Sequence, residues 1–150
     1  MEKPHGRNLR KGRFSEPNRI CLVTMVTKER VPYFNDFHHG RFLVHVLRGE
    51  MPRAETLAYV VMPDHMHRLM QLREGYALSN VVATVKSVSS HRINRTLGRI
   101  GSLWQAGFHD HALRRDEDVA DVARYIVANP LRAGLVKSLG DYSLWDAIWV

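Results

Sequence analysis

Residues 55–72 read ETLAYVVMPDHMHRLMQL, and this stretch predicts two antiparallel strands joined by a tight turn. Glu55 to Met62 is a nearly continuous apolar run, which is typical of a buried strand. Pro63 and Asp64 are residues that favour turns. His65 to Leu72 therefore predicts the return strand of a hairpin.

Two histidines begin the return strand. Side chains at positions i and i+2 of a strand project from the same face, so His65 and His67 are expected side by side, with Met66 on the opposite face. Imidazole binds divalent ions such as Mn, Zn and Ni. Because ligation requires neutral histidine, such a site should weaken below about pH 6.5. The spacing alone leaves open that both are polar surface residues or hydrogen-bonded core residues.

A second segment carries a tyrosine and an asparagine one helical turn apart. Asp116 to Asn129 predicts a helix, with Asp116 as its N-cap and Pro130 ending it. Tyr125 and Asn129 share a polar face, and Tyr125 lies about 100° around the axis from Ile126 on the apolar face. A phenol beside an amide oxygen is a candidate nucleophile next to a metal ligand. A core tyrosine and a helix-ending asparagine are the alternatives.

The remaining elements complete an α+β fold. The expected elements are a strand over Arg19–Thr27, a helix over Asp36–Gly49 with Gly49 as C-cap, a helix over Leu78–Leu97 and a last core strand within Ser102–Arg114. The order β-α-β-β-α-β is that of the ferredoxin-like split βαβ arrangement. We therefore expect an antiparallel sheet backed by helices, with an additional C-terminal helix that carries the tyrosine.

The composition indicates a basic, reduced, single-domain protein. The chain has 150 residues with 22 Lys and Arg against 15 Asp and Glu, a net charge of +7 and a pI near 10.0. That balance favours nucleic acid over membrane as a partner, although a basic protein without a polyanionic ligand is the alternative. Cys21 is the single cysteine, which excludes an internal disulfide and favours the bacterial cytosol or nucleoid. No signal-peptide pattern or membrane-spanning run is expected.

Three segments of the chain are expected. Residues 1–18 predict a loosely ordered basic arm, residues 19–136 a folded domain, and residues 137–150 a tail that docks on the core or helps to recognise a partner. Candidate DNA-backbone contacts are Arg7, Arg10, Lys11 and Arg13 in the arm and Arg92, Arg95 and Arg99 late in the long helix. A disordered tail and a solvated helix end are the alternatives for these two groups.

Three blocks, in this order, resemble the single-tyrosine HUH transposases. Residues 61–67 resemble their His-hydrophobic-His strand. Trp104 with residues 108–114 and 116–118 resembles their next block, and residues 125–136 resemble their tyrosine helix and its exit. The similarity is strongest to the REP-associated tyrosine transposases and covers roughly residues 19–136.

This resemblance implies a ferredoxin-like fold and a Mg²⁺ or Mn²⁺ ion held by His65, His67 and Asn129. It implies Tyr125 as the nucleophile, in a monomer or homodimer that cleaves single-stranded DNA near hairpins through a 5′-phosphotyrosine. Arg68 departs from the pattern, because members usually have an apolar residue there, and Val127 stands where many have histidine. Two other functions stay open: a catalytically silent module that binds hairpins, and a metal-dependent hydrolase that uses bound water.

Overall fold

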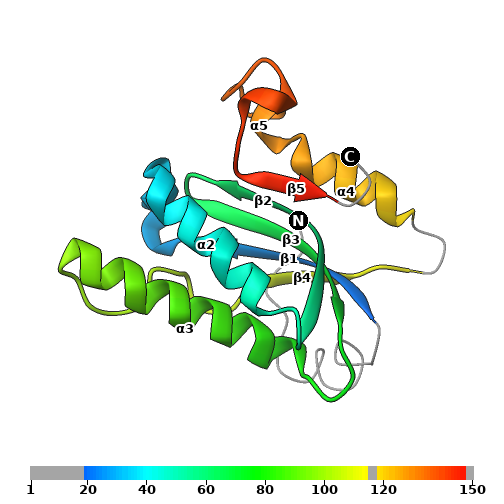
Figure 1. The fold of residues 1–150 in the computed structure, drawn as a ribbon, viewed down its shortest axis with the longest axis horizontal. Coiled ribbons are helices and arrows are strands. Elements are labelled where there is room, and N and C mark those ends of the chain that lie inside the picture. Colours follow the sequence, from blue (N-terminus) through cyan, green and yellow to red (C-terminus); the bar gives the residue numbers. More distant parts are fainter. Residues whose placement is uncertain (1–18, 115–117, 148–150) are drawn as a thin grey trace.

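The protein contains one five-stranded antiparallel sheet with the strand order β4-β1-β3-β2-β5 (Figure 1). The computed structural model describes residues 19–114 and 118–147. The strands are β1 (Ile20–Val26), β2 (Ala54–Met62), β3 (His65–Leu72), β4 (His109–Ala112) and β5 (Trp145–Ala147). The antiparallel sheet backed by helices was predicted from the sequence and is confirmed.

The β2–β3 hairpin forms the centre of the sheet as predicted. Met62 lies opposite His65, and the register continues to Ala54 opposite Leu72, with one irregularity between Thr56 and Ala58. Strand β1 pairs with the other edge of β3. Both neighbours of β3 are therefore fixed by extended hydrogen-bonded ladders, which makes the positions of its side chains well defined.

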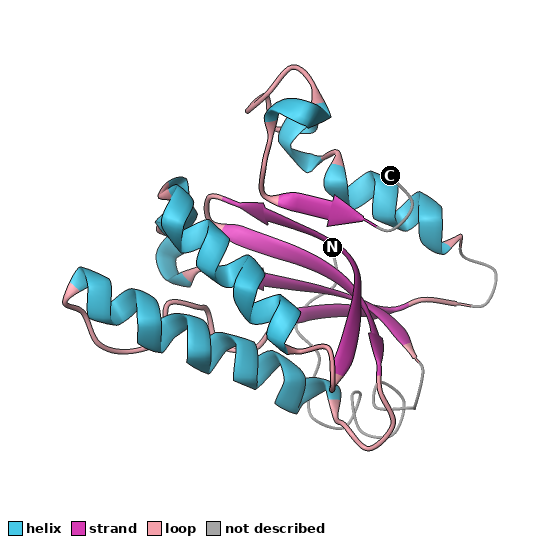
Figure 2. Ribbon diagram, viewed as in Figure 1, coloured by secondary structure: helices cyan, strands magenta, loops and turns pink. Residues whose placement is uncertain are grey.

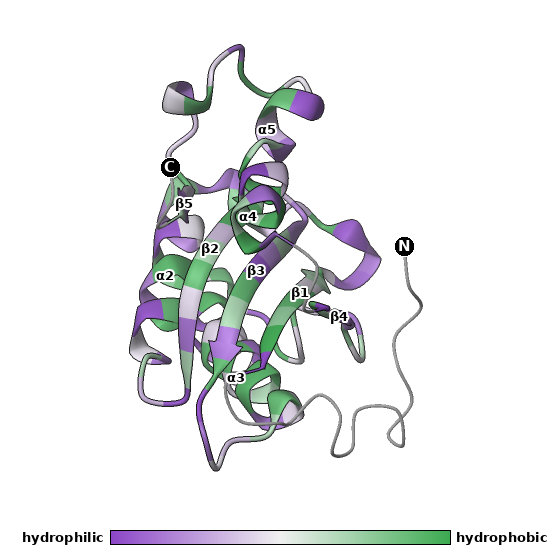
Figure 3. Ribbon diagram, turned by 90° about the vertical axis from the view of Figure 1, so that its right-hand side faces the viewer, coloured by the Kyte–Doolittle hydropathy of each residue, from purple (hydrophilic) through white to green (hydrophobic). Residues whose placement is uncertain are grey.

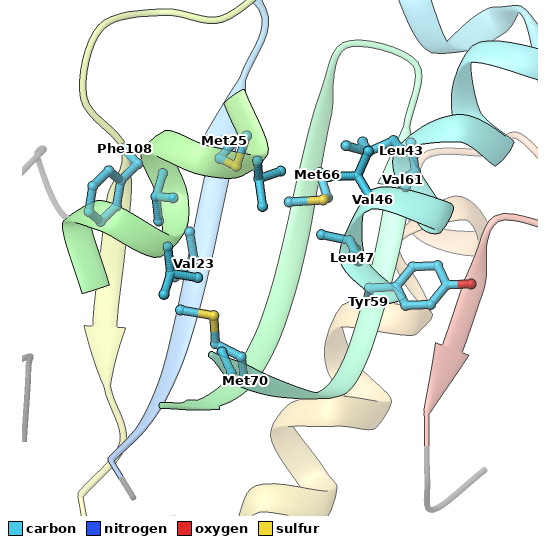
Figure 4. Close-up of a cluster of buried hydrophobic side chains, with 14 of the residues drawn as sticks. Val23, Met25, Leu43, Val46, Leu47, Tyr59, Val61, Met66, Met70 and Phe108 are labelled. Atoms are coloured by element: carbon cyan, nitrogen blue, oxygen red, sulfur yellow. The ribbon is translucent and has the colours of Figure 1, made fainter. Parts of the chain in front are cut away.

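Two helices cover one face of the sheet. They are α2 (Phe37–Gly49) and α3 (Leu78–Leu97), and their apolar side chains pack on Met66 and Met70 of β3 in the larger core cluster (Figure 4). The bounds of α3 agree with the prediction, since Gly98 adopts the left-handed conformation (φ 65°) that ends many helices.

The N-cap of α2 is Asp36, whose side chain accepts a hydrogen bond from the backbone N–H of His38. The expectation that Gly49 caps the other end is wrong by one residue. Gly49 is the last helical residue and Glu50 is the C-cap. Glu50 is held there because its side chain is buried in an ion pair with Arg53 and Arg68.

The opposite face of the sheet is covered by α4 (Val119–Val127) (Figures 2 and 3). This helix packs through Ala123, Ile126 and Val127. The predicted cap Asp116 lies outside the described residues. The N-cap is Asp118, whose carboxylate accepts hydrogen bonds from two backbone N–H groups of the first turn. The helix also ends earlier than expected, because a separate short helix, α5 (Asn129–Arg132), begins at Asn129.

The C-terminal segment adds an edge strand. Short 3-10 turns occur at Lys28–Arg30, Tyr33–Asn35 and Leu139–Asp141. After the last of these, the Tyr142 hydroxyl donates to the Val61 carbonyl, and β5 pairs with Ala58–Val60 of β2. The tail thus docks on the sheet, one of the two roles considered for it. Among the described residues, no helix is both long and apolar enough to cross a membrane.

Candidate active site

His65 and His67 lie side by side at the start of β3, on the sheet face that α4 covers. Their ring centroids are 5.0 Å apart and the rings are nearly perpendicular, at 79°. Met66 between them is fully buried on the other face. The same-face arrangement predicted from the i, i+2 spacing is therefore what the strand produces.

Each imidazole is oriented by a hydrogen bond at Nδ1. His65 Nδ1 lies 2.7 Å from an Asp64 carboxylate oxygen, and His67 Nδ1 lies 2.8 Å from Thr24 Oγ1 on the neighbouring strand. Asp64 is itself held by Arg30, whose Nη1 donates to the other carboxylate oxygen at 3.2 Å. With Nδ1 engaged in both rings, Nε2 is the nitrogen that each histidine can offer to a metal.

The electrostatics around His67 favour a neutral ring. Burial, together with the nearby His65 and Arg132, lowers the pKa of His67 to about 4. Burial by itself raises the pKa of Asp64, but hydrogen bonds from His65 and Arg30 outweigh it, so this pKa lies below its ordinary value. His67 is thus unprotonated at neutral pH, as metal ligation requires.

Tyr125 projects from α4 into solvent. Its side chain is 66% exposed, while its neighbour Ile126 is buried in the smaller core cluster. The polar-face placement was predicted correctly. A hydroxyl in this position is open to water and to a large substrate, so packing does not account for the tyrosine.

Asn129 lies beyond the end of the tyrosine helix, at the start of α5. The expectation that one continuous helix carries both residues is wrong, because Ala128 stands between two separate helices. The two side chains nevertheless meet at a third residue. Arg132 donates from Nη2 to Asn129 Oδ1 at 2.7 Å, and its guanidinium carbon lies 3.9 Å from the centroid of the Tyr125 ring.

The donor groups suit a divalent cation. Two oriented imidazoles and an amide oxygen are ligands that Mn²⁺ and similar ions accept. Among the described residues, no group of three His, Cys, Asp or Glu side chains is arranged to hold a metal. Arg132 donates a hydrogen bond to the amide oxygen of Asn129 and is close enough to His67 to lower the pKa of that histidine.

The other predicted DNA-binding residues lie elsewhere. Arg7, Arg10, Lys11 and Arg13 fall outside the described residues. Arg92, Arg95 and Arg99 belong to α3 and the turn after it, on the helical layer behind the sheet. Arg92 stacks on Phe42 at 4.9 Å and Arg99 on Tyr33 at 5.4 Å, measured to the ring centroids. The structure does not bring these arginines onto the face that carries the histidines.

Arg68, the departure from the family pattern, also points away from the histidines. It is 2% exposed, its Nε donates to Thr56 Oγ1 at 3.0 Å, and its Nη1 lies 3.6 Å from a Glu50 carboxylate oxygen. A buried ion pair on the helical side thus explains the charged residue here. It leaves the histidine face unchanged.

Three residues of the site were not anticipated as such from the sequence: Thr24, Asp64 and Arg132. Asp64 adjoins His65, so its contact is local. Arg132 lies three residues after Asn129, a spacing that brings helical side chains together, and this signal could have been used. No local sequence pattern could indicate Thr24, because its contact depends on the β1–β3 register, which places it opposite His67.

A second His-x-His pattern, His109 and His111 on β4, lies on the same sheet face. Thr24 is opposite His67 on one side and opposite His109 on the other, and Leu22 is opposite His111. The two histidines of β4 are therefore separated from those of β3 by one strand. They are near the site but not adjacent to His65 and His67.

Comparison with known proteins identifies the family of the chain. The family model described as "Transposase IS200 like" matches residues 19–129, which include both histidines, Tyr125 and Asn129. The chain belongs to this family. Its similarity to individual members shows which branch of the IS200-like transposases it is part of.

Two curated relatives are REP-associated tyrosine transposases by name. One, from Haemophilus influenzae and named so provisionally, is 34% identical over 136 residues, which is 82% of this chain and 76% of the relative. The other, from Escherichia coli K12, is 33% identical over 89 residues, or 59% of this chain and 51% of the relative. A solved structure of the REP-associated tyrosine transposase bound to a REP hairpin matches with a TM-score of 0.72 and 26% identity, covering 89% of this chain and 79% of that one. This IS200-like transposase is thus of the REP-associated type.

Proposed function

We propose that this transposase is a metal-dependent endonuclease and strand transferase for single-stranded DNA, which cuts near hairpins through a 5′-phosphotyrosine. One observation supports this above the others. Tyr125 and Asn129 meet at Arg132, and Arg132 is near His67 on the same sheet face of the same chain. The proposal therefore takes the nucleophile and the metal ligands of one site from a single polypeptide.

Each residue has a definite task in this proposal. The Tyr125 hydroxyl oxygen attacks the phosphorus and gives up its proton to solvent, which its exposure permits. The new bond joins Tyr125 to the 5′-phosphate, while the bond from phosphorus to the 3′ oxygen breaks and that oxygen leaves as a hydroxyl after taking a proton. His65, His67 and Asn129 would hold Mg²⁺ or Mn²⁺, which supplies charge neutralisation at the phosphate oxygens.

A folded DNA strand is the substrate that the relatives favour. A protein of the same branch, with a similar fold, has been seen with a REP hairpin. The net charge of +7 suits a polyanion, and binding should weaken steeply as salt is added. We infer that this chain recognises a palindromic repeat that folds back on itself.

The test is a covalent-adduct assay. A 3′-labelled hairpin oligonucleotide, taken from palindromic repeats that flank the gene, is incubated with the protein and Mn²⁺ and run on a denaturing gel. Wild type should retain the 3′-side fragment on the protein, and Tyr125→Phe should bind the hairpin but form no adduct. Tyr76→Phe, which removes a 40% exposed phenol hydroxyl elsewhere, is the matched control and should behave as wild type.

The two other functions give different results in the same assay. A silent hairpin-binding module would shift the hairpin in a native gel and yield no product with any variant. A hydrolase that uses bound water would still cut the DNA as Tyr125→Phe and would carry no label. Either outcome would replace the proposed function.

A further inference from the structure

Arg132 contacts two residues of the proposed active site, and the proposed reaction gives it no role. Its guanidinium lies against the Tyr125 ring at 3.9 Å and donates to Asn129 Oδ1 at 2.7 Å. It therefore contacts both the predicted nucleophile and a predicted metal ligand.

In the described part of the chain, no carboxylate balances the charge of Arg132. Among residues 19–114 and 118–147, no ion pair to an acidic group is formed by Arg132. By contrast, Arg124, on the same helical segment, pairs with Asp121 at 2.8 Å. An exposed cation whose contacts with the described residues are a ring face and an amide oxygen is weakly held and can be recruited by a stronger anionic acceptor.

The geometry next to the phenol suits a phosphate. An arginine has five N–H donors in a planar fork, and only one of them is needed for Asn129. A phosphorus atom that approaches the Tyr125 hydroxyl would bring its non-bridging oxygens close to a cation that already lies on the same ring. Arginine–phosphate pairs are among the strongest charge-assisted hydrogen bonds.

We propose that Arg132 is a further catalytic residue, which donates to a non-bridging oxygen of the phosphate that Tyr125 attacks. This inference rests on the proposed function. Before DNA binds, Arg132 holds Tyr125 and Asn129 in place. With Asn129 Oδ1 engaged as a metal ligand, the guanidinium would release the amide and turn to the phosphate. It would remain protonated throughout and neutralise charge that develops as the new bond forms.

The main test compares two forms of the same hairpin. One form carries an uncharged methylphosphonate at the phosphate that wild type cuts, and the other is unmodified. Binding is measured with Mn²⁺ in the Tyr125→Phe background, where no cleavage occurs, with and without Arg132→Gln. Arg124→Gln, which removes the same charge one helical turn before Ala128, is the matched control.

The expected result is a loss of affinity that is confined to the hairpin with the charged phosphate. Arg132→Gln should weaken binding of the unmodified hairpin roughly tenfold, since hydrogen bonds to charged groups have about this effect, and binding of the methylphosphonate hairpin less than about twofold. Arg124→Gln should affect both forms equally. Equal losses on both forms for Arg132→Gln would overturn the inference, whereas a wild type that forms no adduct at all would overturn the proposed function and this inference together.

A second measurement tests the exchange at Asn129 without DNA. Mn²⁺ affinity of the free protein should rise several-fold in Arg132→Gln, because the amide oxygen is released and a nearby positive charge is removed. The gain should be smaller when Asn129→Ala is also present. Unchanged Mn²⁺ affinity in Arg132→Gln would show that Arg132 does not compete for Asn129 and would overturn the exchange.

Discussion

Arg68→Met should destabilise the fold substantially, although relatives usually have an apolar residue at this position. Arg68 and Glu50 are 2% and 1% exposed and form a buried ion pair at 3.6 Å. Arg68 also donates to Thr56, while Arg53 donates to the other Glu50 oxygen at 2.7 Å. Removing Arg68 therefore leaves a buried carboxylate with one partner instead of two.

The size of the effect follows from these contacts. Breaking a buried ion pair by removing one partner costs about 3–5 kcal/mol, and the remaining contact of Glu50 with Arg53 reduces this to about 2–4 kcal/mol. The pair is imperfect, since Glu50 Oε1 and Arg68 Nη2 are both buried without a hydrogen-bond partner in the described part of the chain. Arg68→Met with Glu50→Gln removes both charges, so the double variant should lie within about 1–1.5 kcal/mol of wild type.

The assay is urea unfolding of the four proteins of this double-mutant cycle at pH 7. Trp104, which is 2% exposed and stacks on Phe34, reports on the core by fluorescence, and far-UV circular dichroism provides an independent signal. Arg41→Met, an exposed arginine on α2, is the control and should stay within about 0.5 kcal/mol. Additive losses in the double variant, or an Arg68→Met protein as stable as wild type, would refute this account of Arg68.

Two further predictions concern β1. Thr24→Val removes the hydrogen-bond partner of His67 Nδ1. The Mn²⁺ affinity measured by calorimetry should therefore fall about tenfold, as for other groups that orient a metal ligand. An unchanged affinity would contradict the assignment of His67 as a metal ligand. Burial, with Asp110 nearby, raises the pKa of Cys21 from 9.0 to about 12. Between these values the unfolded thiol is ionised while the folded thiol keeps its proton, so stability should decrease as pH rises from 9 to 12, by up to about 4 kcal/mol. In urea titrations at several pH values, Cys21→Ala should not show this decrease in stability between pH 9 and 12. A pH profile identical to that of wild type would contradict the assignment to Cys21.

Local patterns predicted the central elements well. The hairpin over residues 55–72 and the helix over residues 78–97 were predicted with nearly correct bounds, because apolar runs, a turn dipeptide and Gly98 are local signals. The His65 and His67 pair and the exposed Tyr125 follow from strand and helix periodicity. Their roles came from resemblance to a family, and the chemistry stays a proposal.

Features that depend on tertiary contacts could not be predicted. Strand β5 is three residues long, and it forms because Leu144 and Tyr142 bind the backbone of Val61. The break at Ala128 placed Asn129 on a new helix although the i, i+4 spacing suggested a single one. The partner of Arg68 is Glu50, eighteen residues earlier, and only the folded sheet brings them together.

The packing of α4 on the sheet of its own chain has a consequence for mixtures of variants. If the tyrosine and the histidines of one site belong to one polypeptide, an inactive variant neither restores nor inhibits the activity of another copy. His65→Ala and Tyr125→Phe proteins, mixed in equal amounts, would then remain as inactive as each alone. Wild type diluted with Tyr125→Phe would lose adduct formation in direct proportion to its own fraction, whereas an exchanged helix would create hybrid sites and restore activity in the first mixture.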